Sequence, residues 1–258
     1  MKFCVISPIK GLERYAKQSR THLILAQLLY NQEYRAFYTT RRQAGDFLIL
    51  DNGTYENTRP LDSAQLFNFC QAMVPNVLVL PDILMSPWRK TTSATLHYLD
   101  QYADQPTMRD YPTEYMFVPQ TTKEDPGGWM KALHQVVNDG RQGHRVTWVG
   151  LGRYLARKMD KITMRIDLAK QVKQNYPHLK LHALGMADGS IEELKALRDV
   201  GVDSIDSSCA VWRGWNGFAL ADPEWVEKGT NCDFYADESP ITEKLIQSNL
   251  EVIFNAIS

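Results

Sequence analysis

The sequence predicts an α/β protein that folds as a (β/α)8 TIM-like barrel with a short helical extension at its C-terminus. Eight short apolar runs, rich in β-branched residues, alternate with longer amphipathic stretches between Phe3 and Ser208. Eight such units suffice to close a barrel. No low-complexity segment or long linker divides the 258 residues, of which 44% are apolar, so we expect one domain with a large core. A doubly wound open sheet, which shows the same alternation, is the competing fold.

Each apolar run is expected to form one strand. The second run could equally belong to a helix, because the residues from Leu23 to Leu29 also fit a helical period. Proline stands at junctions between elements, for example at Pro81 and Pro126, where it is tolerated. In chain order, the expected strands are Phe3–Ser7, His22–Ala26, Phe47–Asp51, Asn76–Asp82, Tyr115–Gln120, Arg145–Leu151, Lys180–Gly185 and Ser204–Ser208.

The stretches between these strands predict amphipathic helices. The first has Asp62 directly before it, a residue type that caps helix N-termini. We assign the barrel to residues 1–214 and the C-terminal extension, which ends in a closing helix, to residues 215–258. The expected helices are Ser63–Met73, Pro87–Tyr102, Asp125–Asn138, Asp160–Tyr176, Ser190–Val200 and the closing Ile241–Ile257.

Charge and composition restrict the possible partners. The formal net charge of −1 argues against indiscriminate binding of nucleic acid. Residues 153–173, however, contain seven basic and two acidic side chains, a pattern that fits either a phosphate-binding surface or a solvated helix face with ion pairs. No apolar run is long enough to span a bilayer, and the chain starts directly with a strand pattern, so we expect a cytoplasmic protein without a membrane partner.

The cysteines and histidines predict neither a disulfide framework nor a metal site. Cys4, Cys70, Cys209 and Cys232 are scattered and form no Cys-x-x-Cys pair, and no His stands at ligand spacing. Buried thiols are the expected state. We predict that the protein needs neither a metal nor another cofactor.

Polar residues and glycines stand at the carboxyl ends of the predicted strands, which is where barrel enzymes assemble their active sites. Asp51 and Asp206 are the most informative, because an acid at the end of a buried strand is costly unless it is paired or used. Acids can accept hydrogen bonds from a flat ligand, glycines let backbone approach it, and Tyr55 and Met186 could hold a ring between them. The strand-end residues are Asp51, Asn52, Asp82, Gln120, Gly150, Gly152, Gly185, Asp206 and Ser207.

Six segments of the chain resemble, in the same order, motifs of the tRNA-guanine transglycosylases and their DNA-acting DpdA-type relatives. Residues 201–206 (GVDSID) are similar to the segment that carries the nucleophilic aspartate, and residues 50–55 (LDNGTY) to the segment with the general acid/base. Each motif alone is weak evidence for the resemblance, whereas six in the family's order at predicted strand ends are stronger evidence. The other four segments are residues 79–82 (VLPD), 118–120 (VPQ), 149–152 (VGLG) and 182–186 (HALGM).

The resemblance implies a role for each matching residue. Asp206 would be the nucleophile and Asp51 the proton carrier of a pentosyltransferase that exchanges guanine for a 7-deazaguanine base, such as 7-cyano-7-deazaguanine. Asp82 and Gln120 would bind the edge of the base. The backbone of Gly150, Leu151 and Gly152 would contact its exocyclic atoms, and Tyr55 and Met186 would hold its ring.

Two departures from the family pattern bear on the substrate. The C-terminal zinc motif of the tRNA enzymes is missing, since only Cys232 lies in that region, and a monomer is favoured because that subdomain supports dimerisation in the family. Trp212 and Trp215 stand on either side of Arg213 where tRNA enzymes have arginines, and an indole can stack on a splayed base. We therefore expect DNA rather than tRNA as the polymer, contacted by these three residues and by Arg153, Arg157 and Lys158, and a host-cytoplasmic location if the protein is phage-encoded.

Other interpretations remain open at this stage. Asp206 and Asp82 could cap helices, Asp51 could form a turn, Gln120 could bond within a loop, and the two tryptophans could close the core. The whole chain could be a tRNA enzyme, a catalytically inactive nucleic-acid-binding subunit, or a barrel lyase or isomerase for a small phosphorylated metabolite. The last class needs a Schiff-base lysine or a metal cluster, and no predicted strand ends on Lys.

Overall fold

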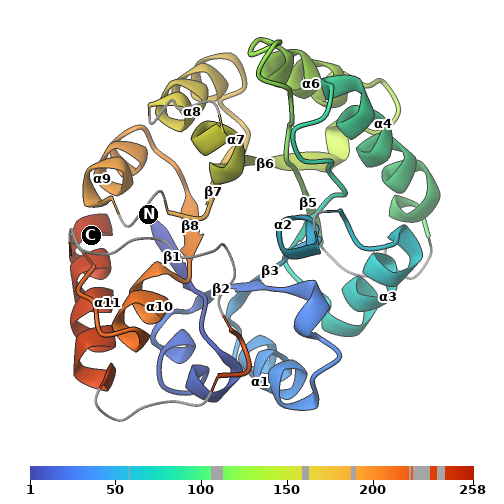
Figure 1. The fold of residues 1–258 in the computed structure, drawn as a ribbon. Helices are drawn as coiled ribbons and strands as arrows, with labels where there is room; N and C mark the ends of the chain where they lie inside the picture. The colour runs from blue at the N-terminus through green and yellow to red at the C-terminus, as the bar shows by residue number, and fades with distance from the viewer. Residues whose placement is uncertain are drawn as a thin grey trace.

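Eight parallel strands form a nearly closed barrel surrounded by helices, as seen in Figure 1. The computed structural model describes residues 1–57, 59–105, 113–158, 163–186, 190–220, 222, 233–236 and 242–258. Neighbouring strands follow the order β1-β8-β7-β6-β5-β4-β3-β2, in which the first strand pairs with the last. This order is that of a barrel and not of a doubly wound sheet, whose strand order reverses, so the predicted fold is confirmed.

The strands are short and their inward side chains fill the barrel. Parallel ladders run from β1 through β8 to β2, with Cys4 opposite Asp206 and Leu50 opposite Leu78. At the remaining seam, the Ser19 hydroxyl, just before β2, donates to the Phe3 carbonyl of β1 at 2.6 Å. The strands are β1 (Lys2–Val5), β2 (Thr21–Ile24), β3 (Phe47–Leu50), β4 (Val77–Val79), β5 (Glu114–Phe117), β6 (Val146–Gly152), β7 (Lys180–Leu184) and β8 (Ser204–Ser207).

All eight predicted strands are present, with shorter ends in several places. The second run is a strand and not the alternative helix; only a 3-10 turn at Ala26–Leu28 follows it. The strands β4 and β5 stop at Val79 and Phe117, two residues before Pro81 and Pro119. Proline has no N–H to donate to a ladder, which explains why the pairing ends early.

The helices form a ring around the barrel (Figure 1). Four helices that the sequence did not predict, α1, α2, α7 and α10, follow β2, β3, β6 and β8. The Asn31 side chain caps α1 by accepting from the N–H of Tyr34 at 2.9 Å. The expected cap Asp62 accepts from the N–H of Ala64 at 3.0 Å. The helices are α1 (Gln32–Gln43), α2 (Thr54–Asn57), α3 (Ser63–Met73), α4 (Trp88–Tyr98, continued by a π-helical turn at Leu99–Ala103), α6 (Gly128–Val137), α7 (Arg153–Lys158), α8 (Met164–Asn175), α9 (Ile191–Asp199), α10 (Cys209–Trp215) and α11 (Glu243–Ile257).

The C-terminal helix belongs to the ring. Only two 3-10 turns, Ile9–Gly11 and Ala16–Gln18, lie between β1 and β2, and α11 packs against β1, α9 and α10 instead. The amide of Asn249 on α11 donates to the Ala210 carbonyl at 3.1 Å and its oxygen accepts from the N–H of Leu220 at 2.7 Å. Residues 160–162 and 241, the expected starts of two helices, and Cys232 lie outside the described residues.

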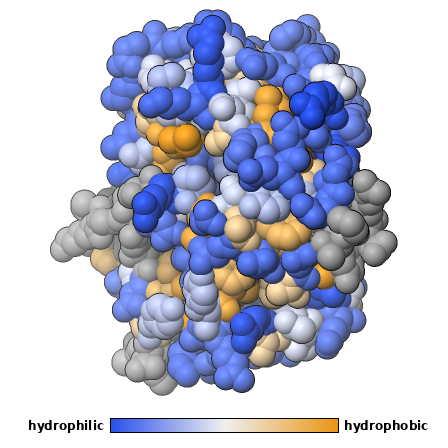
Figure 2. Space-filling model, turned by 90° about the vertical axis from the view of Figure 1, so that its right-hand side faces the viewer, coloured by the Kyte–Doolittle hydropathy of each residue, from blue (hydrophilic) through white to orange (hydrophobic). Residues whose placement is uncertain are grey.

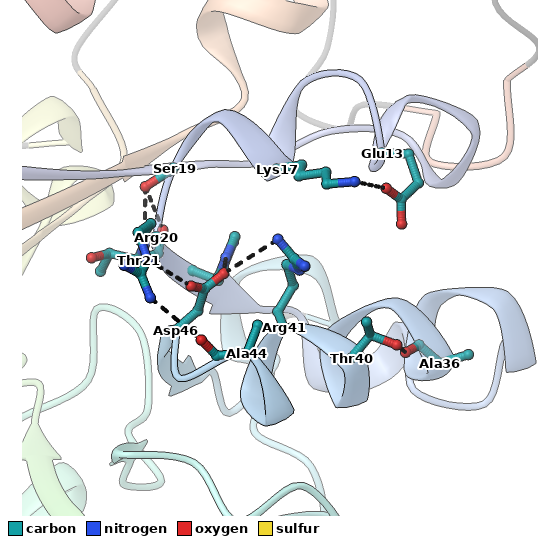
Figure 3. Close-up of polar contacts among 11 residues, drawn as sticks. Glu13, Lys17, Ser19, Arg20, Thr21, Ala36, Thr40, Arg41, Ala44 and Asp46 are labelled. Atoms are coloured by element: carbon teal, nitrogen blue, oxygen red, sulfur yellow. Dashed lines mark hydrogen bonds and ion pairs between the residues drawn. The ribbon is translucent and has the colours of Figure 1, made fainter.

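A buried acid at the amino end of the barrel shows how an ordinary structural carboxylate is held here. Asp46 precedes β3 and accepts from Arg20 at 3.0 Å and from His22 at 3.1 Å, with Arg41 at 3.7 Å, as Figure 3 shows in part. Burial raises the pKa of Asp46, but these donors outweigh burial and the net pKa is below its usual value. Asp46 is therefore a charged anchor between β2, α1 and β3.

One face of the molecule is shown by hydropathy in Figure 2. On the face shown in Figure 2, hydrophilic side chains predominate and apolar residues show between them. Within the described parts of the chain, no helix is long and apolar enough to cross a membrane. In the same parts, no cluster of three or more His, Cys, Asp or Glu side chains could bind a metal ion, and Cys4, Cys70 and Cys209 are not joined in disulfides.

Candidate active site

A cavity of about 190 Å³ opens at the carboxyl ends of the strands, where barrel enzymes bind their substrates. Its wall is built by residues that follow or end β3, β4, β5, β6, β7 and β8, together with apolar side chains of β2 and β4. Four acids line it: Asp51, Glu56, Asp82 and Asp206. The predicted acids thus meet in one place, as the parallel strands require.

Asp206 is held as an oriented carboxylate. It lies on β8, is 6% exposed, and its Oδ1 accepts from the backbone N–H of Gly185 at 3.1 Å. The buried ring of His182 on β7 lies 3.0 Å from the same oxygen through Nε2, while its Nδ1 lies 2.8 Å from the Ser204 hydroxyl. With Ser204 donating to Nδ1, Nε2 carries the ring proton and donates to Asp206. Both of these hydrogen bonds end on Oδ1, and among the described residues no hydrogen bond reaches Oδ2.

A buried ion pair fixes the turn that supplies one of these donors. Gly185 adopts a φ of 75°, a left-handed conformation that glycine tolerates and other residues rarely adopt. Arg165 is 1% exposed; it pairs with Glu193 at 2.7 Å and donates through Nη1 to the carbonyls of Gly185 at 2.7 Å and Leu184 at 3.1 Å. The pair therefore holds the end of β7 so that the Gly185 N–H points at Asp206.

Asp51 follows β3, and its environment differs from that of Asp206. Its Oδ2 accepts from the backbone N–H of Gly53 at 2.9 Å, and no Lys or Arg of the described chain forms an ion pair with it. Burial raises its pKa well above the usual value; the nearby charges of Glu56, Asp206 and Asp82 raise it further, against the Gly53 bond. Asp51 therefore holds its proton more tightly than an exposed aspartate does.

The cavity wall also carries a hydrogen-bonded group centred on Asp82. Asp82 accepts from the Asn52 amide at 2.8 Å on Oδ1 and from the Gln120 amide at 2.7 Å on Oδ2. Asn52 also donates to the Leu80 carbonyl at 2.7 Å, which fixes its orientation. Burial raises the pKa of Asp82 despite these donors. The oxygen Oε1 of Gln120 is buried and has no hydrogen-bond partner among the described residues, so it is an acceptor without a donor.

Aromatic and cationic side chains surround the mouth of the cavity. Tyr55, 37% exposed, meets Tyr154 edge to face with ring centroids 5.9 Å apart. Lys158 lies over the Tyr154 ring at 5.3 Å, and Arg153 and the half-buried Trp212 line the cavity nearby. Rings and cations together are the components with which proteins bind bases and phosphates of single-stranded nucleic acid.

The predicted contacts from glycines and Met186 are only partly found at the cavity. Gly152 lines it, but Gly150 does not; a Cβ at Gly150 would lie 2.7 Å from the Val118 side chain, so this glycine allows close packing inside the barrel. Leu151 is likewise buried and absent from the wall. Met186 is buried away from the cavity, and Leu184, on the same β7 segment, lines the wall in its place.

The predicted nucleic-acid contacts also divide into two groups. Trp212 lines the cavity, whereas Trp215 packs against the hydrophobic core and is absent from the wall. Arg213 lines the cavity but is buried and donates to the Leu220 carbonyl. Arg157 is exposed on α7 together with Lys158.

The basic stretch at residues 153–173 is not one charged surface. Arg165 is buried in the ion pair with Glu193, and Lys173 pairs with Asp203 at 3.1 Å. Lys170 is exposed on α8, and Lys161 lies outside the described residues. The remaining cations, Arg153, Arg157 and Lys158, gather on α7 beside the cavity mouth.

Three residues of the site were not predicted from the sequence: Glu56, Tyr154 and His182. The alternation of inward and outward side chains was available as a signal for His182, because it shares the inward face of β7 with Leu184 and pairs in register with Ser204. Glu56 and Tyr154 stand on the short helices α2 and α7 directly after strand ends. Patterning gave no sign of these helices.

No protein-family model matches this chain, and no curated protein is significantly similar to it. The resemblance to transglycosylases therefore stays a prediction that rests on the six motifs and on the geometry described above. Chemically, that geometry provides an oriented carboxylate, a second acid with a raised pKa and a hydrogen-bonding edge around one cavity. Two acids in different environments are typical of sites that pair a nucleophile with a general acid.

Proposed function

We propose that this protein is a base-exchanging transglycosylase that replaces guanine in DNA by a 7-deazaguanine base, such as 7-cyano-7-deazaguanine. The observation that carries the proposal is the unequal environment of the two acids. Asp206 accepts two hydrogen bonds that orient its carboxylate, whereas burial and the neighbouring acids raise the pKa of Asp51 well above its usual value. Nucleophilic displacement at a sugar carbon needs one carboxylate of each kind.

In the first half of the reaction, Oδ2 of Asp206 attacks C1′ of the target nucleotide. The new C–O bond forms as the bond from C1′ to N9 breaks, and its electron pair leaves with the base. Asp51 transfers its proton to the departing guanine, which leaves neutral. The DNA remains joined to Asp206 as a glycosyl ester, and the negative charge has moved from Asp206 to Asp51.

In the second half, the incoming base reverses these steps. Its N9 gives a proton to the Asp51 carboxylate and attacks C1′, and the ester bond to Asp206 breaks. Both acids return to their starting states, so no oxidant, reductant or high-energy cofactor is consumed. The phosphodiester backbone stays intact throughout.

The cavity edge supports a guanine-like base. Guanine presents N–H donors on the edge opposite its sugar, and Asp82 together with the unpartnered oxygen of Gln120 offers acceptors there. Asp51 and Asp206 line the same cavity and would face the sugar. A purine bound there could supply the donor that Oε1 of Gln120 lacks among the described residues.

DNA is preferred over tRNA because of the cavity mouth. Trp212 and Tyr55 offer flat faces for an extruded nucleotide and its neighbours, and α7 offers Arg157 and Lys158 for phosphates. Exchange in tRNA is the second candidate, since the same chemistry would serve it. A barrel enzyme for a small metabolite has less support, because the described residues that line the cavity include no Lys.

A paired incubation tests this function. Purified protein is incubated with labelled 7-cyano-7-deazaguanine and either DNA, both single-stranded and duplex, or tRNA, and the digested nucleosides are analysed by mass spectrometry. We expect label in deoxynucleosides, with single-stranded or mismatched DNA preferred because its bases need no unpairing. Label in tRNA alone would reverse the choice of polymer, and label in neither would refute the proposed exchange.

A further inference from the structure

Glu56 is a fourth acid of the cavity, and the reaction proposed above does not use it. It lies on α2, five residues after Asp51, and its half-buried side chain lines the cavity. Its oxygen Oε2 is buried without a hydrogen-bond partner among the described residues. An ionised carboxylate with a buried, unpartnered oxygen is unstable, so this position calls for a proton or a donor.

The surroundings of Glu56 are acidic rather than basic. Its own backbone N–H and the nearby Gln27 side chain lower its pKa, but less than burial raises it. Both amide atoms of Gln27 are buried without a hydrogen-bond partner among the described residues. No Lys or Arg of the described chain forms an ion pair with Glu56, in contrast to Asp46 at the other end of the barrel. The titratable and charged groups around it are Asp51, Asp206, Tyr34 on α1, and the cavity residues Asp82, Arg153 and Arg213.

Electrostatic coupling links Glu56 to both reacting acids. Burial and the charge of Asp206 raise the pKa of Glu56 to about 7, and Glu56 is the strongest of the charges that raise the pKa of Asp51. A change in the charge of any one acid therefore changes the proton affinity of the other two. Asp206 loses its charge when it forms an ester, at the moment when Asp51 gains one.

We propose that Glu56 is the proton reservoir of the site, which acts through Asp51: it returns a proton to Asp51 after guanine has left and receives one when the incoming base is deprotonated. This role rests on the proposed base exchange. The protons balance: one moves from Glu56 to Asp51 in the covalent intermediate, and one returns from Asp51 to Glu56 as Asp51 accepts the N9 proton of the incoming base. Glu56 thereby removes the negative charge from the carboxylate nearest the sugar while the intermediate waits for its second base.

The test combines a titration that needs no activity with a kinetic measurement. Side-chain carboxyls are labelled with 13C, and Glu56 is titrated by NMR in the wild type and in Asp206→Asn and Asp51→Asn. We expect a Glu56 midpoint near 7 in the wild type, and a lower midpoint in Asp206→Asn, where the charge that raises it is gone. A Glu56 that titrates like an ordinary exposed glutamate, unaffected by Asp206→Asn, would overturn the proposal.

The kinetic arm uses Glu56→Gln, which keeps size and polarity but cannot carry the proton. We expect kcat for base exchange to fall by about tenfold or more, with KM nearly unchanged and with the ionisation near pH 7 missing from the pH profile of kcat. Glu251→Gln, an exposed site on α11 away from the cavity, is the matched control and should behave as wild type. An unchanged kcat and pH profile in Glu56→Gln would overturn the role of Glu56. Absence of exchange in the wild type would refute the function instead, and the titration would still decide whether the acids are coupled.

Discussion

Nε2 of His182 lies 3.0 Å from Oδ1 of Asp206 inside the barrel, and the opposite ring nitrogen lies 2.8 Å from the Ser204 hydroxyl. His182 stands one layer deeper than Asp206, so it supports the carboxylate from below without reaching the cavity, whose wall does not include it. Among the described residues, no Lys or Arg forms an ion pair with Asp51. In the proposed reaction, the bond from His182 orients Asp206 as the nucleophile, while Asp51 carries the proton.

Replacing His182 by Phe should impair catalysis more than binding. The ring volume is kept, but Asp206 loses one of its two donors and its orientation, so we expect kcat for base exchange to fall by about 10- to 100-fold, or about 1.4–3 kcal/mol, with little change in KM. Ser204→Ala, one step further from the cavity, should have a smaller effect. Steady-state kinetics of the two variants checks this order, and a Ser204→Ala variant that is the more impaired of the two would contradict it.

Gly185→Ala should slow the reaction beyond its effect on stability. At a φ of 75° an added Cβ strains the backbone by about 1–2 kcal/mol, and the N–H that donates to Asp206 would move. Gly45→Ala is the matched control, since Gly45 has a φ of 80° with open space around it at the amino end of the barrel. Both variants should lose similar stability in urea unfolding, but only Gly185→Ala should lose kcat. Equal kcat values in the two variants would argue against the role of this turn.

The two tryptophans of α10 should separate into a substrate contact and a core residue. Trp212→Ala should weaken DNA binding by about 1–3 kcal/mol, the value of one base-stacking contact, and should leave the melting temperature nearly unchanged. Trp215→Ala should lower the melting temperature because its ring packs against the core. Fluorescence anisotropy with labelled single-stranded DNA and thermal unfolding give the two readouts. The reverse assignment of effects would show that Trp215 is the substrate contact.

Asp51 should make stability depend on pH in a direction opposite to most carboxylates. Its pKa is raised in the folded protein, so the folded state binds more protons than the unfolded state at pH values between the usual aspartate pKa and the raised one. Stability that is present below the usual pKa is therefore lost as the pH rises through this window. Asp51→Asn should remove the part of this pH dependence that Asp51 causes. The free energy of unfolding of the variant, relative to that of the wild type, should therefore be higher at pH 8 than at pH 4. Urea unfolding at both pH values measures the difference, and parallel curves would contradict the prediction.

The barrel could be predicted from the sequence because its signal is repeated eight times and each repeat is local. The order of strands followed from the fold, and it brought Asp51, Asp82, Gln120 and Asp206 to one cavity as expected. The helix ring was less predictable. No α-helix lies between β1 and β2, and α11 from the C-terminal end of the chain packs against β1 instead. A local sequence pattern cannot indicate such a long-range arrangement.

The details of the site depended on single residue steps that hydrophobic patterns do not resolve. Leu184 faces the cavity and Met186 does not, because the left-handed Gly185 between them changes the direction of the chain. Gly150 matched a motif but serves packing against Val118. From the sequence, Arg165 was expected to be a surface charge. Its ion pair with Glu193, 28 residues further along the chain, allows it to be buried instead. Long-range pairs of this kind are beyond a reading of local sequence.

The central claim, that Asp206 forms a covalent ester with the substrate sugar, has a direct measurement. Wild-type protein is mixed with a guanine-containing single-stranded oligonucleotide in the absence of an incoming base, quenched in denaturant, and analysed by intact-protein mass spectrometry. We predict an added mass equal to that of the oligonucleotide without one guanine, located by digestion to the peptide that contains Asp206 and absent in Asp206→Asn. Base exchange without this adduct, or an adduct that persists in Asp206→Asn, would contradict the account.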